Sequence, residues 1–441
     1  MLLLYLSLLV LALAVQWIRK RFRYWEDRGV PYVTPAFPTG NLRGFGRKFH
    51  ISTIMQRCYK QLKGKGPFGG IFMFTNPVVL VKDFQYFEDR LFYYNEKDNP
   101  IEAHLVALEG TRWRNSRSKV TSVFSSGKMK MMFPTMIRVA DEFSKVLTRE
   151  TAQGKSIAMK DFLSRYTTDV VGTCTFGVDC NSLNYPKAVY RQMGKKAFNF
   201  TFLKVMLAEQ FRDIARALHV TFFDSDVSNF FLNVVKDIFE YREQNNVQQI
   251  DFTSLLSRLK NPDSESGENT NQQEYWSIEE IAAQLFVFFL AGSETPSTTM
   301  SFCLYELAAN AELQERARAN VLQSIEKHGF MSYEAIHEMH FLEQCINESL
   351  RKYPPVASLL RTVTRDYPVP DSGGVILQRG TTMIVPVYAI HHDPEYYSDP
   401  ETYDPDRFSA DLVAQRNPLC FVPFGAGPRT CIGLRFGMTS T

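Results

Sequence analysis

The sequence predicts a mainly α-helical protein with a small β region, and three observations carry that prediction. A capping box, Ser277-x-x-Glu280, opens a segment in which apolar residues cover nearly every face of a helix. A helix that is apolar all round is buried, so we expect a long central helix over about 278–310. Polar periodic segments predict surface helices, and short β-rich runs predict only a few strands. The expected surface helices lie at 312–327 and 333–352, and the expected strands at 77–81 and 383–387.

The charge balance argues against a nucleic-acid partner. The chain has 441 residues with 50 basic and 47 acidic side chains, a formal net charge of +3. So small an excess gives no bulk attraction to phosphates, and no nucleic-acid-binding motif is present. A content of 45% hydrophobic and 22% charged residues is typical of a globular protein, which excludes wholesale disorder and a multi-spanning membrane bundle.

The body of the chain contains no long linker and no internal repeat, and its one polar low-complexity stretch is 261–273. We therefore expect one large domain over 41–441. Prolines, glycines and basic residues before it predict a stiff, basic elbow over 19–40.

Residues 1–18 are predicted to be an N-terminal membrane anchor. The seventeen residues from Leu2 to Ile18 would span about 25 Å as a helix, which is short but sufficient. A cleaved signal peptide is the alternative, because Ala12-Leu13-Ala14 resembles a cleavage site. No Lys or Arg precedes the apolar run and a dense cationic cluster follows it, which favours an uncleaved anchor with a cytosolic domain.

The seven cysteines are odd in number, widely spread and contain no Cys-x-x-Cys pair, so neither a disulfide framework nor a zinc site is implied. We expect six packed thiols and one with special chemistry, Cys431. Gly425, Gly427 and Gly433 around it allow tight turns and close approach to a flat ligand, and backbone N–H groups there can stabilise a thiolate. Arg429 can supply a cation for a ligand carboxylate.

The segment Phe424-x-x-Gly427-x-Arg429-x-Cys431-x-Gly433 resembles the haem-thiolate signature of the cytochrome P-450 superfamily at every defined position. The resemblance implies the P-450 fold, with a long central helix over the haem and minor sheets. It also implies haem b as cofactor, with Cys431 as the axial iron ligand and the other four residues around the haem. Thiolate ligation donates electron density that favours cleavage of the O–O bond.

A second part of the resemblance is a buried Glu-Arg-Arg network. Glu348-x-x-Arg351, followed by Arg407, matches the family pattern in which these residues lock a helix to the segment before the haem loop. By itself, an i,i+3 acid–base pair is more often a surface ion pair that contributes about 0.2 to 0.5 kcal/mol. The resemblance gives the three residues a structural role in haem capture.

Ala291-Gly292-Ser293-Glu294-Thr295 resembles the family's oxygen-activation motif. That resemblance implies that Gly292 leaves room for dioxygen and that the Glu294–Thr295 pair relays protons. The alternative is a glycine packed against another helix and a satisfied polar pair. Pro296 departs from the commoner Thr or Ser, and we expect it to kink the helix where oxygen binds.

Three arginines form a predicted clamp for the haem propionates. Trp113 and Arg117 resemble the family's Trp-x-x-x-Arg helix, and Arg361 stands where the family has another propionate ligand. With Arg429 they would neutralise the two haem carboxylates. Each arginine taken singly is more often a solvated surface residue.

A basic patch lies near the Trp113 segment, with Arg114, Lys119 and Lys128 as candidates for docking a reductase and Arg112 and Lys130 beside them. A solvated face is the default interpretation of such a run. The resemblance instead implies electron transfer from NADPH–cytochrome reductase, and from cytochrome b5 as a possible second donor, so that NADPH is used indirectly.

Further segments are similar to the insect microsomal detoxifying members of the family. They are 93–98, 126–134 and 388–394. This similarity implies oxidation of lipophilic xenobiotic or endogenous compounds at the endoplasmic reticulum membrane, with the catalytic domain facing the cytosol. Phe288, Val356 and Phe202 are candidate pocket residues, and core packing is an equal reading for the phenylalanines.

Two other functions stay open. One is a haem-thiolate isomerase or dehydratase that works without a reductase, against which the Glu294–Thr295 pair argues. The other is a catalytically defective or truncated haem-binding form. Only 10 residues follow Cys431 (441 − 431), and the junction of Val81 with Lys82 is shorter than the family pattern, so we expect a chain that is incomplete at its C-terminus.

Overall fold

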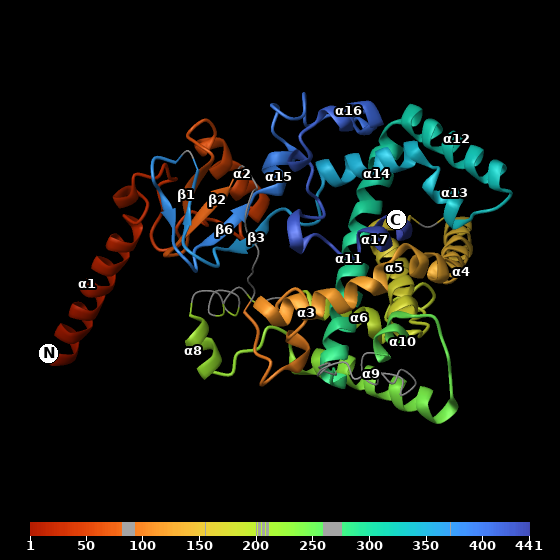
Figure 1. Cartoon of the computed structure of the whole chain (residues 1–441), viewed down its shortest axis with the longest axis horizontal. Helices are drawn as coiled ribbons and strands as arrows, with labels where there is room; N and C mark the ends of the chain where they lie inside the picture. Colours follow the sequence, from red (N-terminus) through yellow and green to blue (C-terminus); the bar gives the residue numbers. More distant parts are fainter. Residues whose placement is uncertain are drawn as a thin grey trace, which may run out of the picture. The chain divides into compact units, whose positions relative to one another are not determined.

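The structure, a computed structural model, describes residues 1–81, 93–154, 156–199, 201, 204, 208, 211–258, 276–370 and 372–441. The chain divides into two compact units, each built from two segments. The first unit comprises Met1–Leu91 and Asn347–Thr430, and the second comprises Phe92–Ile346 and Cys431–Thr441. Helices dominate and the strands are few and short, so the mainly α architecture with a small β region is confirmed (Figure 1).

The first unit contains both sheets. Its helices are α1 (Leu2–Phe22), α2 (Ile51–Leu62), α15 (Val387–His391) and α16 (Ala410–Gln415). Its strands are β1 (Phe68–Met73), β2 (Asn76–Val81), β3 (Leu359–Thr362), β4 (Tyr367–Pro368), β5 (Ile376–Leu377) and β6 (Thr382–Val385).

The larger sheet has the order β1-β2-β6-β3, and β4 pairs with β5 in a second sheet. Strand β2 pairs antiparallel with β1 and parallel with β6, and β6 pairs antiparallel with β3. Both faces of β2 are buried because its side chains alternate: Val78 and Leu80 pack with α2, whereas Val79 and Val81 pack with Trp25. The two predicted strands are confirmed, except that the second ends at Val385.

The second unit is helical. It contains α3 (Gly110–Thr121), α4 (Ser126–Ala152), α5 (Met159–Phe176), α6 (Val189–Ala197), α8 (Arg212–Ala217), α9 (Ser225–Asn245), α10 (Phe252–Ser257), α11 (Ile278–Ala309), α12 (Ala311–His328), α13 (Tyr333–His337) and α17 (Leu434–Ser440). Helix α14 (His340–Lys352) contributes residues to both units.

Helix α11 is the predicted central helix. Its capping box is present, because Ser277 Oγ accepts the Glu280 N–H at 3.2 Å and Glu280 Oε2 accepts the Ser277 N–H at 3.0 Å. Phe286 and Phe289 are fully buried, and their rings pack against that of Phe231 with centroids 5.0 and 5.1 Å away. Figure 1 shows α11 running through the second unit beside α5.

The expected single helix over 333–352 is wrong, because the chain forms α13 and α14 with a break between them. Ser324 Oγ donates to the Ala335 carbonyl at 2.6 Å, and this carbonyl also accepts the Glu338 N–H at 3.2 Å, an i,i+3 bond that tightens the last turn of α13. Asn320 Oδ1 accepts the N–H groups of Phe341 and Leu342 at 3.0 and 3.3 Å, which satisfies the first turn of a new helix. The surface helix at 312–327 is confirmed as α12.

Helix α1 continues through the basic residues that follow position 18 and ends at Phe22. In the part of the chain that the structure describes, no helix has both the length and the apolar content of a membrane span. The membrane anchor over 1–18 and the elbow over 19–40 stay predictions. The polar stretch 261–273 and the far side of the Val81–Lys82 junction lie outside the described residues.

Candidate functional site

Cys431 differs from every other cysteine of the chain. All seven are described: six are buried free thiols, as expected, and Cys431 alone is exposed. The protein around its sulfur limits hydration and raises the pKa of the thiol, while the Gly433 N–H and the positive charge of Arg117 oppose that shift. A bound metal cation would add to these two effects and favour the thiolate over the neutral thiol, so the exposed Cys431 fits metal ligation by a single cysteine.

One face of α11 is open at two positions. Every residue of this helix is described, and between Ile281 and Met300 only Ala291 and Thr295 are exposed as whole residues, whereas Glu294 is half-buried with 45% of its side chain exposed. Residues four apart lie one above the other on the same helix face. The predicted oxygen-activation motif therefore has a single accessible stripe, formed by its first and last residues.

Gly292 packs against a neighbouring helix, and room for dioxygen beside it stays a prediction. A Cβ atom added at Gly292 would lie 2.6 Å from Val171 Cγ2 of α5 and 3.6 Å from Phe436 Cε1 of α17. Its missing side chain is thus what allows α5 to approach α11 closely. This is the packing alternative, and the open positions of the motif are Ala291 and Thr295.

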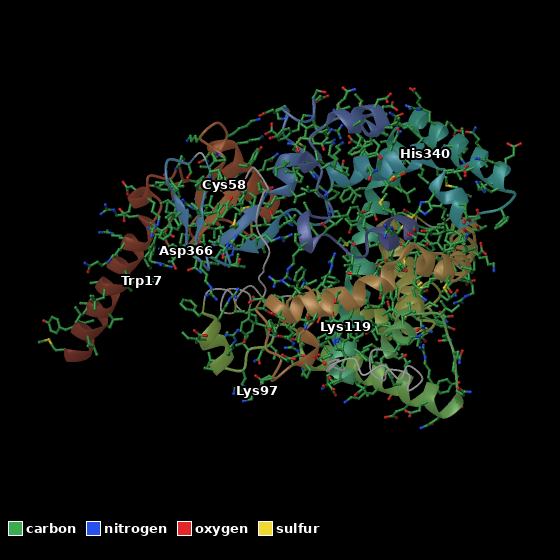
Figure 2. All side chains as sticks on the ribbon, in the orientation of Figure 1. Trp17, Cys58, Lys97, Lys119, His340 and Asp366 are labelled. Carbon is green, nitrogen blue, oxygen red and sulfur yellow. The ribbon has the colours of Figure 1, made fainter. Side chains whose placement is uncertain are left out.

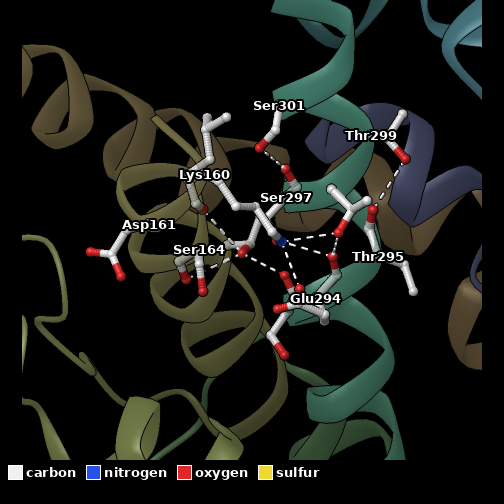
Figure 3. Close-up of polar contacts among 12 residues, drawn as sticks. Lys160, Asp161, Ser164, Glu294, Thr295, Ser297, Thr299 and Ser301 are labelled. Carbon is white, nitrogen blue, oxygen red and sulfur yellow. Dashed lines mark hydrogen bonds and ion pairs between the residues drawn. The ribbon is translucent and has the colours of Figure 1, made fainter. Parts of the chain in front are cut away.

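Glu294 does not contact its predicted partner Thr295 through its side chain. Its carboxylate Oε1 accepts from Lys160 Nζ of α5 at 2.6 Å, and both side chains are 45% exposed (Figure 3). Thr295 Oγ1 instead donates to the Ala291 carbonyl at 2.8 Å. Glu294 and Thr295 are therefore adjacent in sequence, but the Glu294 side chain binds Lys160 of α5 and the Thr295 side chain binds the backbone of its own helix.

Hydroxyl side chains support α11 around Pro296, which is buried within the continuous helix. Ser297 and Thr298 both donate to the Glu294 carbonyl, at 3.0 and 2.9 Å. Thr167 of α5 donates to the Ser293 carbonyl at 2.6 Å. Such bonds use helix carbonyls and tend to bend helices, which adds to the effect expected of proline.

Helix α3 carries the predicted haem-contacting pair of the second unit. Trp113 is 6% exposed and belongs to the main core, whereas Arg117 is half-buried and its charge acts on Cys431. These two positions are one turn apart, so α3 presents an indole and a guanidinium on one face.

The predicted basic patch is partly neutralised within the second unit. Arg112 donates to both carboxylate oxygens of Glu96, and Lys130 forms an ion pair with Glu334. Arg114 is exposed, Lys128 is half-buried, and the Lys119 ammonium lies 5.4 Å from the Trp276 ring centroid. Figure 2 marks Lys119 on α3. Docking of a partner by Arg114, Lys119 and Lys128 stays a prediction.

In the first unit, Arg361 and Arg429 form a second cationic element. Burial lowers the pKa of Arg361, and the like charge of Arg429 lowers it further. Arg361 Nη1 donates to the Leu360 carbonyl at 2.8 Å. Gly425, with φ of +75°, brings the loop to these arginines, since its added Cβ would lie 3.9 Å from Arg361 Nη2. Two neighbouring guanidinium groups fit an anionic ligand such as a haem propionate.

The Glu-Arg-Arg network exists and is buried. Arg351 donates from Nε and Nη2 to the two carboxylate oxygens of Glu348, both at 2.7 Å, and both side chains are 0% exposed. Arg407 Nε lies 3.6 Å from Glu348 Oε1, which also accepts the Asp404 N–H at 3.0 Å. Burial raises the pKa of Glu348, and the paired Arg351 opposes that shift.

His391 connects this network to the segment before Cys431. Its Nδ1–H donates to the Arg351 carbonyl at 3.2 Å, and its Nε2 accepts the Val422 N–H at 3.1 Å. Arg351 Nη1 donates to the His391 carbonyl at 3.0 Å. Burial, with the charge of Arg351, lowers the pKa of His391 to about 3, so the ring is neutral. Its partners lie 40 and 31 residues away along the chain, so no local sequence pattern indicates this role.

The predicted pocket residues have different surroundings. Phe288 is 6% exposed, and its ring packs on Phe124 and Phe252 with centroids 5.0 and 5.7 Å away, which is the core-packing alternative. Val356 is 43% exposed in the first unit. Phe202 lies outside the described residues.

Comparison with known proteins agrees with these features. The sequence profile described as "Cytochrome P450" matches residues 35–441. The chain is 40% identical to "Probable cytochrome P450 6a14" of Drosophila melanogaster, over 97% of this chain and 88% of that protein. It is 39% identical to "Cytochrome P450 6A1" of Musca domestica, over 99% and 88%, and 39% identical to "Cytochrome P450 6a2" of Drosophila melanogaster, over 99% and 90%.

Replacement of Arg351 tests the buried network. Arg351→Ala leaves the Glu348 carboxylate buried without its bidentate partner, so we expect the free energy of unfolding to fall by about 3 to 5 kcal/mol. Arg318→Ala is the matched control, because Glu315–Arg318 has the same i,i+3 spacing but its side chains are 66% and 58% exposed. The control should lose less than about 1 kcal/mol. Equal losses in urea unfolding would contradict the assigned role.

His391 makes stability depend on pH. With a native pKa of about 3 and an ordinary value of 6.5, the unfolded chain binds the proton more tightly. The unfolding free energy should therefore fall as the pH drops from 6.5 towards 3, by about 1.4 kcal/mol per pH unit from this residue. His391→Gln keeps a donor and an acceptor but does not titrate, so its profile should be flatter by that slope. Ring NMR signals that show a charged His391 at pH 5 would refute the prediction.

Proposed function

Because the chain belongs to the cytochrome P450 family and is a monooxygenase of that family, we propose that it oxidises lipophilic small molecules with electrons that a reductase takes from NADPH. The substrates are xenobiotic or endogenous compounds, and the enzyme works at the endoplasmic reticulum membrane with its catalytic domain in the cytosol. The observation that carries the proposal is the exposed Cys431 within one unit that also holds the open Ala291–Thr295 stripe.

The overall reaction balances as RH + O2 + NADPH + H+ → ROH + NADP+ + H2O. One oxygen atom enters a C–H bond of the substrate, and the other leaves as water with two electrons and two protons. Bound haem supplies the iron that activates dioxygen. The protein must then hold the haem, deliver protons and admit electrons from its partner.

Cys431 is the residue that would bind the haem iron through its thiolate, and the Gly433 N–H and the Arg117 charge favour the negative sulfur against the effect of burial. Arg117 with Trp113, and Arg361 with Arg429, are the groups that would hold the two propionates. The mutual repulsion of Arg361 and Arg429 supports this role, because an anion between two guanidinium groups relieves it.

Thr295 and Glu294 supply proton transfer. Thr295 lies on the open stripe of α11, and its hydroxyl keeps lone pairs free to accept while it donates to Ala291. Glu294 is 45% exposed, so its carboxylate can exchange protons with solvent. The two residues together connect water to the accessible face of the helix.

Electron delivery uses the basic surface around α3. Arg114, Lys119 and Lys128 would attract an acidic flavoprotein reductase, with cytochrome b5 as a second donor for the same surface. Arg112 and Lys130 are paired within the unit and contribute less net charge to docking.

Cys431 is tested by the carbon monoxide difference spectrum of the reduced full chain. The wild type should give the red-shifted Soret band of a thiolate-ligated haem, and Cys431→Ser should lose it. Cys58→Ala, which removes a buried thiol in the first unit, is the control and should keep the band. A red-shifted band in Cys431→Ser would overturn the ligand assignment.

Charge reversal tests the docking surface. Arg114→Glu with Lys119→Glu should raise the apparent KM for reductase by roughly tenfold at low salt and flatten its dependence on ionic strength. Lys145→Glu changes an exposed cation elsewhere on α4 and should leave both quantities unchanged. An unaltered KM in the double variant, with a normal carbon monoxide spectrum, would refute the assignment.

A further inference from the structure

Lys160 of α5 directs its ammonium group onto a single turn of α11. Nζ donates to Glu294 Oε1 at 2.6 Å, to Ser297 Oγ at 2.8 Å and to Thr298 Oγ1 at 2.9 Å (Figure 3). An ammonium has three donor hydrogens, and here all three have acceptors. The side chain is therefore fully engaged with the residues that flank Pro296.

The hydroxyls of Ser297 and Thr298 determine which groups donate and which accept in this hydrogen-bond cluster. Both donate their hydrogens to the Glu294 carbonyl, at 3.0 and 2.9 Å, so each can only accept from Lys160. Ser297 is 0% exposed. The cluster thus holds both the backbone and the side chain of Glu294 from the α5 side.

This placement keeps the acid away from the open stripe of α11. Successive residues of a helix are about 100° apart around its axis, so Glu294 and Thr295 point in different directions. Lys160 holds the Glu294 carboxylate, whereas Thr295 is exposed on the Ala291 face. For Glu294 to pass a proton towards Thr295, its carboxylate must leave Lys160.

We propose that Lys160 is a positioning residue that latches Glu294 on the α5 side and limits the rate of proton delivery. The inference rests on the proposed function, since it concerns the proton relay of that reaction. Both partners are 45% exposed, and ion pairs of such exposure are weak enough to open on every turnover. The latch therefore restrains the relay without blocking it.

Lys160→Gln tests the latch, because it removes the charge and keeps a hydrogen-bond donor. An exposed pair changes an equilibrium by roughly 1.4- to 5-fold, so the proton-limited step should accelerate by that factor. The solvent deuterium isotope effect on substrate oxidation should fall accordingly. Lys160→Arg should restore wild-type behaviour, and in a Glu294→Gln background Lys160→Gln should have no effect.

The matched control is Lys236→Gln. Lys236 of α9 forms an ion pair with Glu279 of α11 at 3.5 Å, and these side chains are 41% and 39% exposed. Glu279 lies in the first turn of α11, away from the Ala291–Thr295 stripe. This variant should leave the isotope effect unchanged.

A second readout does not depend on activity. A double-mutant cycle of Lys160→Gln and Glu294→Gln in urea unfolding of the full chain should give a coupling of the same roughly 1.4- to 5-fold in the unfolding constant. No coupling, or an isotope effect that Lys160→Gln alters equally in the Glu294→Gln background, would overturn the latch. A wild-type chain without the red-shifted carbon monoxide band would overturn the proposed function instead. The double-mutant cycle would still measure the interaction between Lys160 and Glu294.

Discussion

The packing of α11 is the constraint on which the second unit depends. A helix that is apolar on all sides must be covered on all sides, and α5 reaches it closely because Gly292 has no side chain to meet Val171. Close packing leaves few accessible positions, so the exposure of Ala291 and Thr295 within the buried stretch becomes informative. The same packing brings Lys160 onto the helix. The packing around α11 thus leaves Ala291 and Thr295 accessible to a ligand, whereas Gly292 contributes to contact between helices.

The first unit depends on a different interaction, the fully buried pair of Glu348 and Arg351. Two charges in the interior are tolerated only when their remaining donors and acceptors are satisfied. That requirement recruits the Asp404 N–H and the His391 carbonyl, and through the His391 ring it extends to the Val422 N–H. The segment that leads to Cys431 is therefore tied to α14 by hydrogen bonds and not only by apolar contact.

Sequence reasoning succeeded where a local pattern has one physical outcome. The capping box at Ser277, the apolar and buried faces of α11 and the six buried cysteines are of this kind. It failed where a distant side chain decides the outcome. The break before α14 depends on Asn320, which lies outside the segment predicted as one helix. Lys160 left no local signal, since its acidic partner is 134 residues away along the chain.

Two carboxylate–cation pairs of this chain differ mainly in burial, and that difference separates their roles. Opening the pair of Glu348 and Arg351 would leave charges stranded in the interior, at a cost of several kcal/mol, so it behaves as a fixed joint. Opening the pair of Glu294 and Lys160 exposes both groups to water that is already in contact with them, at a cost of about 0.2 to 1 kcal/mol. Thermal motion supplies that much easily. A residue that must move during turnover needs the second kind of partner, and Glu294 has one.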